Sequence, residues 1–70
     1  MKDLEQRLLA AHAAHDQQAL ITLYEEAANT SSGDEAVGFY LTHAYVFALE
    51  LGDPHALHLH ERLRKLGREH

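Results

Sequence analysis

Histidine is the residue type in this sequence best suited to bind a metal, because the 70-residue chain contains seven histidines and no cysteine. Two pairs have a spacing of three residues, His12 with His15 and His55 with His58. This spacing places both imidazoles on one face of a helix. A zinc site needs three or four converging ligands, and neither pair has a third ligand nearby in the sequence. We therefore expect no metal or cofactor, with a His-rich metal-binding bundle as the alternative.

Groups suited to catalysis do not form a recognisable arrangement. Ser31 and Ser32 lie in a polar loop, outside the Gly-x-Ser-x-Gly context of a hydrolase nucleophile. The adjacent acids Glu25-Glu26 and Asp34-Glu35 are expected to be solvated carboxylates near helix ends. A domain of 70 residues also has little room for a deep substrate pocket. The sequence therefore predicts a protein that is not an enzyme.

An excess of apolar side chains between residues 37 and 51 is the strongest indication of function. Two stripes follow helical spacing there. The first contains Val37, Tyr40, Leu41, Ala44, Ala48 and Leu51, and the second contains Phe39, His43, Val46 and Phe47. A chain of this size has few side chains to cover a helix that is apolar nearly all round. The second stripe is therefore either core or a contact surface for another protein.

Four helices are expected to position these side chains, and no segment alternates as a strand would. The expected helices are Lys2 to Ala14, Gln17 to Asn29, the segment from the Ser32 cap to Leu51, and Pro54 to about Gly67. Asp16 and Asp53 are the expected N-caps of the second and fourth helices. Ser32 with Glu35 has the spacing of a capping box, and Gly52 is expected to end the third helix. The predicted fold is all-α.

The two halves of the chain are related by an internal repeat with an offset of 37 residues, as the numbering of equivalent positions shows (41 − 4 = 37). Equivalent pairs include Leu4 and Leu41, Ala11 and Ala48, Asp16 and Asp53, Ala19 and Ala56, and Leu20 and Leu57. The same offset places His60 at the position of Leu23, so we expect a partly buried imidazole there.

This repeat resembles the tetratricopeptide repeat (TPR) family. The resemblance rests on Leu41, Ala44 and Tyr45, on Asp16-x-x-Ala19-x-x-x-Leu23-x-x-x-Ala27, and on Gly52-Asp53 with Ala56. The sequence departs from the family at Gly38, where Trp is favoured, and at Thr42, where a packing Gly is favoured. The resemblance implies two antiparallel helical hairpins in a single domain, residues 1–70. An up-down four-helix bundle is the alternative.

The resemblance also implies a concave face that holds a peptide or protein partner. The residues that it places there are Phe39, His43, Val46 and Phe47, with Leu9 among their first-repeat counterparts. We expect a protein-interaction module that associates with itself as a homodimer, since self-association is a common way to cover such a patch. Solenoids usually need three or more repeats, which also favours stacking across a subunit interface.

Charge and hydropathy indicate which partners and which cellular location to expect. The net charge of −5 disfavours nucleic acid, although Arg62, Arg64, Lys65 and Arg68 gather near the end of the chain. Cations there also complement the dipole of the last helix. No apolar run approaches the length of a membrane span, and Met1 begins no signal segment. We expect a cytoplasmic protein without membrane or small-molecule partners.

Overall fold

Four α-helices form most of the chain in a computed structural model, which describes residues 2–67. The helices are α1 (Lys2–Ala13), α2 (Gln17–Thr30), α3 (Asp34–Leu51) and α4 (His55–Lys65). No strand occurs within the described range, so the predicted all-α class is confirmed. The helix boundaries differ from the expected ones by one or two residues, which is the usual uncertainty of helix ends.

The turns after α1 and α3 have the same backbone hydrogen bonds at the 37-residue offset. The bonds are Asp16 N to Ala11 O (2.9 Å) and His15 N to His12 O (3.1 Å) after α1, and Asp53 N to Ala48 O (2.9 Å) and Gly52 N to Leu49 O (3.1 Å) after α3. Gly52 (φ 70°) and His15 (φ 54°) adopt the left-handed conformation that such helix ends require. His15 therefore lies beyond α1, and the expectation that it shares a helix face with His12 was wrong.

Of the three predicted N-caps, only Asp16 is the cap residue of its helix, because α4 has Pro54 rather than Asp53 as its N-cap residue, without a side-chain cap bond. Asp16 Oδ1 accepts a hydrogen bond from Ala19 N (3.2 Å), and Asp53 Oδ1 accepts one from His55 N (2.8 Å). The predicted capping box at Ser32 was wrong, because Gly33 is the cap residue of α3 and makes no side-chain cap bond. The polar loop instead completes α2, where Ser31 Oγ donates to Ala27 O (2.8 Å).

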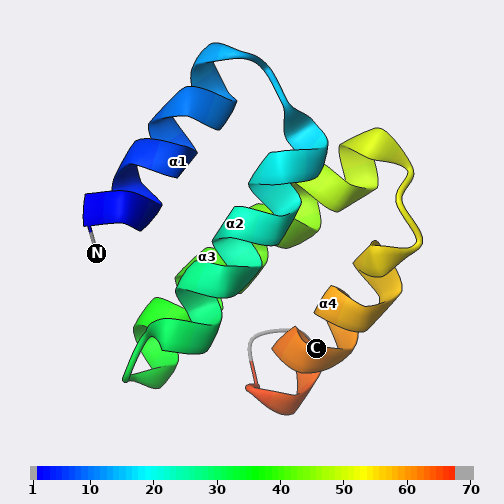
Figure 1. The fold of residues 1–70 in the computed structure, drawn as a ribbon. Helices are drawn as coiled ribbons and strands as arrows, with labels where there is room; N and C mark the ends of the chain where they lie inside the picture. The colour runs from blue at the N-terminus through cyan, green and yellow to red at the C-terminus, as the bar shows by residue number, and fades with distance from the viewer. Residues whose placement is uncertain (1, 68–70) are drawn as a thin grey trace.

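The helices pack in chain order, α2 against α1 and α3, and α4 against α3. Figure 1 shows that the chain reverses direction at each turn, with α2 in front of α3 and α4 beside it. The resulting body is a slab with Cα extents of 33 × 28 × 12 Å. A slab this thin has two broad faces and a narrow interior, so much of its apolar surface lies close to solvent.

The core is built largely from small side chains. Thirteen apolar residues are buried in the described range, and six of them are alanines. Alanine lets helix axes approach closely, and Leu41, Ala44 and Ala48 of α3 are fully buried between α2 and α4. A second cluster joins α1 to α2 and contains Leu4 and Ala11. The repeat pairs Leu4 with Leu41 and Ala11 with Ala48 are thus buried in both halves.

Candidate functional site

The five predicted partner-binding residues divide into exposed and half-buried side chains. Leu9 on α1 is 69% exposed, and Phe39 and Val46 on α3 are 57% and 45% exposed. His43 and Phe47 are half-buried, and Phe47 packs against both core clusters. The second stripe of α3 is therefore divided, with Phe47 contributing to the core while Phe39 and Val46 face solvent.

Aromatic rings from three helices form a continuous row across this region, here named the aromatic row. Its members in order are Phe39, His43, Tyr24, Phe47 and His12, with centroid separations of 4.4, 5.1, 5.9 and 6.1 Å between successive rings. Tyr24 stacks nearly parallel to Phe47, with an interplanar angle of 17°. Rings at these separations attract each other beyond simple burial, so the row is a rigid support for the exposed residues beside it.

Hydrogen bonds hold the polar members of the aromatic row in place. His43 Nδ1 donates to the Phe39 carbonyl oxygen at 2.9 Å, since a carbonyl can only accept. The Nε2 atom of His12 lies 2.9 Å from the Tyr24 hydroxyl. Burial of the Tyr24 side chain, together with the charge that Tyr40 would carry, raises the pKa of its hydroxyl, so Tyr24 stays neutral. A shallow groove lined by Thr42, His43, Val46 and Phe47 runs alongside.

Tyr24 and His12 were not expected in this surface. Tyr24 adjoins the buried Leu23 on α2, and its position in the sequence predicts only that it belongs to the apolar face of that helix. The sequence pattern relates His12 only to His15. Both residues join the aromatic row because α1 and α3 lie on either side of the same stretch of α2, a relation that is set by the packing of the helices.

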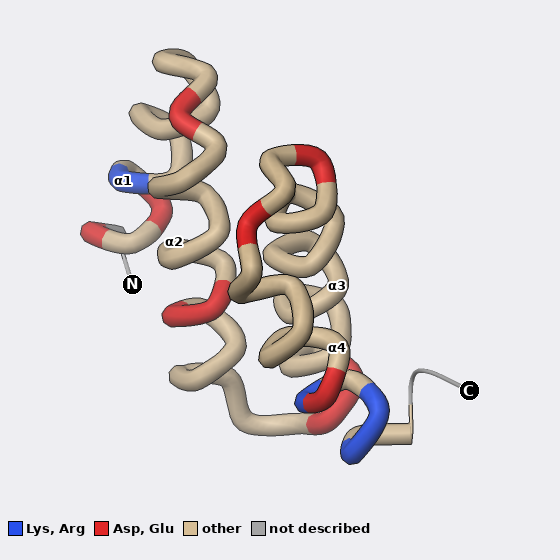
Figure 2. Tube along the Cα trace, turned by 90° about the vertical axis from the view of Figure 1, so that its right-hand side faces the viewer, with Lys and Arg blue, Asp and Glu red and all other residues tan. Residues whose placement is uncertain are grey.

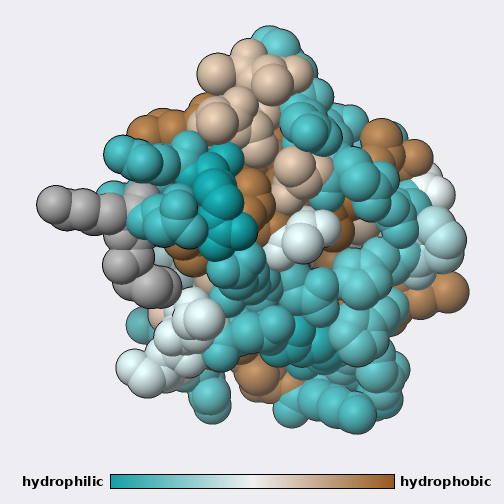
Figure 3. All heavy atoms as spheres, viewed as in Figure 1, coloured by the Kyte–Doolittle hydropathy of each residue, from teal (hydrophilic) through white to brown (hydrophobic). Residues whose placement is uncertain are grey.

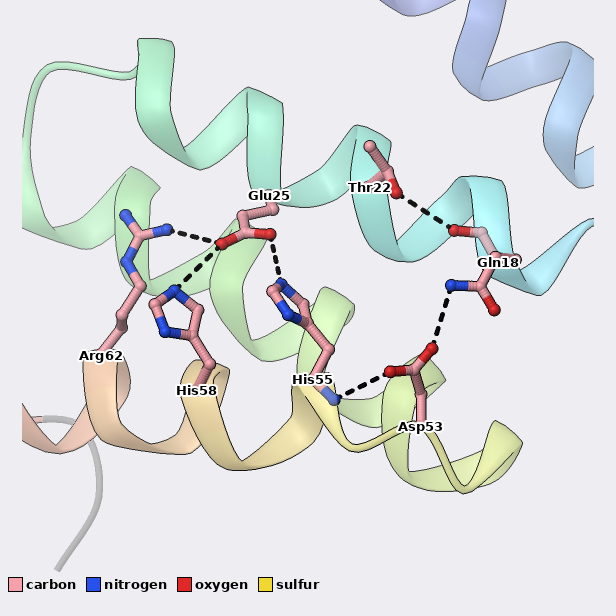
Figure 4. A network of polar contacts seen from close by, with 7 residues as sticks. All are labelled: Gln18, Thr22, Glu25, Asp53, His55, His58 and Arg62. Carbon is pink, nitrogen blue, oxygen red and sulfur yellow. Dashed lines mark hydrogen bonds and ion pairs between the residues drawn. The ribbon is translucent and has the colours of Figure 1, made fainter.

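A second arrangement lies between α2 and α4, where Glu25 faces two histidines (Figure 4). His55 Nε2 donates to Glu25 Oε1 at 2.6 Å, and His58 Nε2 lies 3.5 Å from Glu25 Oε2. One donor atom from each of the three residues lies within 4.8 Å of the other two. The set Glu25, His55 and His58 is here named the histidine–carboxylate cluster. No third potential ligand lies near His55 and His58 in the sequence, and the fold brings the Glu25 carboxylate of α2 beside them.

Arg62 completes the surroundings of Glu25. Its Nη1 donates to Glu25 Oε2 at 3.2 Å. Glu25 and Arg62 are equivalent in the internal repeat (62 − 25 = 37), so equivalent positions of opposite charge pair with each other between α2 and α4. Partial burial of Glu25 acts to raise the pKa of its carboxyl, but the bonds and charges of His55 and Arg62 outweigh it and hold this pKa below its ordinary value.

The first turn of α4 is held in place by contacts with α2. Gln18 Nε2 donates to Asp53 Oδ2 at 3.0 Å, while the other oxygen of Asp53 caps the amide of His55 (Figure 4). The bond from the His55 amide and then the bond from Gln18 lower the pKa of the Asp53 carboxyl. The Gln18–Asp53 bond and the Glu25–Arg62 pair therefore hold α2 against α4 on the two sides of His55 and His58.

The surface over α2 and α4 is polar. Figure 3 shows this face largely covered by hydrophilic residues, with hydrophobic ones mainly at its edges. Figure 2 shows that basic residues gather at the C-terminal end of α4. Arg62 pairs with Glu25 and Arg64 pairs with Glu61, so acids of the chain itself neutralise both of these cations. Arg68, the last of the expected basic cluster, lies outside the described residues.

Comparison with known proteins does not assign the chain to a family. No protein-family model matches the chain, and no curated protein or solved structure is significantly similar to it. None of the helices in the described range is both long enough and apolar enough to cross a membrane. The molecule is a small all-α protein with an aromatic surface on one region and a histidine–carboxylate cluster on another.

Proposed function

We propose that this protein is a non-enzymatic interaction module that binds a second copy of itself through the aromatic row and the exposed side chains beside it. The observation that supports this proposal is the exposure of Phe39 at one end of the aromatic row and of Val46 in the groove beside it, together with exposed Leu9 on α1. Large apolar side chains with a rigid aromatic support are typical of the centre of a protein interface.

A second copy of the chain is the occupant that the shape of the molecule favours. A slab 12 Å thick that buries thirteen apolar residues has a modest core, and stacking two slabs face to face would extend it. A two-fold arrangement also places the same exposed residues of each copy against each other, which is the commonest symmetry among homo-oligomers.

We further propose that the two helical pairs correspond to two TPR-like units. The matching backbone bonds at the turns after α1 and α3, and the buried pairs Leu4–Leu41 and Ala11–Ala48, support this relation. In a repeat architecture each unit covers its neighbour, and stacking across a dimer would supply the additional neighbours that two units lack.

The test is the solution mass of the full chain by light scattering, from high to low micromolar concentration. We expect a dimer that dissociates on dilution, and we expect Phe39→Glu to be a folded monomer at every concentration. We place the charge at Phe39 rather than at Phe47. Phe47 packs against both core clusters, so its replacement would disturb folding. Circular dichroism would verify that the variant keeps its helices.

A matched control is Leu57→Glu, which places the same charge on an exposed leucine of α4, away from the aromatic row. We expect Leu57→Glu to dimerise as the unmodified chain does. A folded monomer at all concentrations for the unmodified chain would overturn the proposal. Dissociation by Leu57→Glu with no effect of Phe39→Glu would also overturn it, because the interface would then lie on α4.

A further inference from the structure

We propose that Glu25, His55 and His58 form a binding site for a divalent transition-metal ion such as Zn²⁺. The site lies between α2 and α4 and uses none of the residues of the aromatic row. It therefore goes beyond the proposed self-association, and it revises the expectation from sequence that the histidines hold no metal.

The donor set fits a transition metal better than Mg²⁺ or Ca²⁺. Two imidazole nitrogens and one carboxylate oxygen suit zinc, nickel or copper, whereas Mg²⁺ and Ca²⁺ prefer oxygen ligands throughout. Three protein ligands with a fourth position left for water are a common zinc arrangement. Only one of the three residues is an acid, so this cluster differs from a surface group of carboxylates.

The distances require only small side-chain movements. Donors around one zinc ion lie about 2.0–2.2 Å from it, and hence no more than about 4.4 Å apart. The three donor atoms of the cluster already lie within 4.8 Å of one another. His55 Nε2 and Glu25 Oε1 are 2.6 Å apart with a proton between them, and the ion would replace this proton. The ion needs this nitrogen free of its proton, which a neutral imidazole can carry on Nδ1 instead, and competition from protons would weaken binding at low pH.

The surroundings of the cluster already orient its ligands. Arg62 donates to Glu25 Oε2, which leaves Oε1 for the ion and holds the carboxylate plane in place. Asp53 fixes the backbone at His55, and Gln18 ties Asp53 to α2. The Glu25 side chain is 19% exposed and that of His58 is 57% exposed, so an ion in solution could reach a partly enclosed carboxylate from the His58 side.

His58 distinguishes a metal site from a structural ion pair. An ion pair that joins α2 to α4 is already complete with His55 and Arg62, at 2.6 and 3.2 Å from Glu25. His58 is the most exposed member, and its Nε2 lies 3.5 Å from the carboxylate, so it adds little to that pair. As a third ligand, however, it is essential to a metal site.

The experiment is a Zn²⁺ titration of the full chain after treatment with a chelator. Calorimetry measures the binding, and thermal unfolding measures its effect on stability. We expect saturation at one ion per chain and an upward shift of the unfolding midpoint, because an ion that binds only the folded state stabilises it. Mg²⁺ should produce neither effect. The same titration on Phe39→Glu should give the same result, which separates the metal site from self-association.

Matched variants locate the site. We expect His58→Gln to weaken zinc affinity at least tenfold while its metal-free unfolding midpoint stays close to that of the unmodified chain. The control His15→Gln removes an exposed histidine outside the cluster and should leave the affinity unchanged. Glu25→Gln should also weaken binding at least tenfold, and Glu26→Gln, which alters the neighbouring acid paired with Arg7, should not.

Two results would overturn the proposal. One is a titration with no saturation at one ion per chain, which would show that the cluster is an ion pair alone. The other is an equal loss of affinity for His58→Gln and His15→Gln, which would show that zinc binds to histidines in general. Both variants change exposed side chains, so folding can be verified by circular dichroism before each titration.

Discussion

The two histidine pairs of this chain have the same spacing in the sequence and different surroundings in the fold. His12 lies near the end of α1 beside the Tyr24 hydroxyl, and His15 lies past the end of the helix in the left-handed conformation. His55 and His58 both lie in the first two turns of α4, and both face Glu25. A spacing of three residues places two imidazoles on one face only where the helix continues through both of them.

The comparison also shows where a third ligand comes from. The carboxylate beside His55 is 30 residues away in the sequence and belongs to another helix. The corresponding neighbour of His12 is a neutral hydroxyl within a stack of rings. The first pair is therefore suited to an apolar contact surface and the second to a cation, although the sequence motif is the same.

Removing the Glu25 carboxylate beside His55 and His58 should have the largest effect on stability. In the absence of metal we expect Glu25→Gln to lower the free energy of unfolding by about 1–3 kcal/mol, the usual range for hydrogen bonds to a charged group. The variant leaves Arg62 and His55 without their anionic partner. Urea denaturation of the two proteins, with chelator present, measures the difference.

Glu26→Gln is the control for this loss. Glu26 pairs with Arg7 at 2.7 Å, but both side chains are more than one-third exposed. Solvent screens such a pair, so the variant should change the free energy of unfolding by less than about 1 kcal/mol. An equal loss for the two variants would mean that the pairing of α2 with α4 adds nothing beyond an ordinary surface ion pair.

The pH dependence of stability tests whether the Glu25 carboxylate is the source of this difference. The pKa of Glu25 is held below its ordinary value of 4.5, because the bonds from His55 and Arg62 outweigh the effect of partial burial. A carboxyl with a lowered pKa contributes stability above its unfolded pKa and loses it as the pH falls through the folded pKa. We therefore expect the advantage of the unmodified chain over Glu25→Gln to be complete near neutral pH and to shrink below about pH 5.

The measurement is the urea midpoint of both proteins from neutral to acid pH. Glu61→Gln provides a reference, because Arg64 likewise lowers the pKa of Glu61 but that pair lies on the surface of α4. Its difference from the unmodified chain should be smaller across the same range. A constant gap between the unmodified chain and Glu25→Gln at every pH would contradict the assignment of this stability to the Glu25 carboxylate.

The sequence predicts well those features that depend on residues close together in the chain. The cap at Asp16 and the end of α3 at the left-handed Gly52 are confirmed, because each uses hydrogen bonds that span at most five residues. Asp53 accepts a bond from the nearby His55 amide, but the N-cap residue of α4 is Pro54. The partly buried position of His60 agrees with the structure, where its ring lies 5.5 Å from that of Tyr45. The predicted capping box at Ser32 was wrong because α3 begins one residue later, with Gly33 as its cap residue.

Features that depend on the packing of separate helices were harder to predict. The repeat equates Leu57 with the buried Leu20, yet Leu57 is 79% exposed, because no further helix in the described chain packs on that side of α4. The same repeat equates Glu25 with Arg62. Opposite charges at positions related by the 37-residue offset were a signal that could have predicted the contact between α2 and α4, and with it the carboxylate beside the histidine pair.

The smallest effect on stability is expected from the contact between His12 and the neutral Tyr24 hydroxyl. Tyr24→Phe removes the hydroxyl that lies 2.9 Å from His12 Nε2 and keeps the ring that stacks on Phe47 and His43. An exposed neutral hydrogen bond is readily replaced by water, so we expect a change within about 0.5 kcal/mol in the free energy of unfolding. Zinc affinity should not change. A loss as large as that of Glu25→Gln would show that the His12 contact is as important to the fold as the charged bridge, and the distinction between the two histidine pairs would then rest on zinc binding alone.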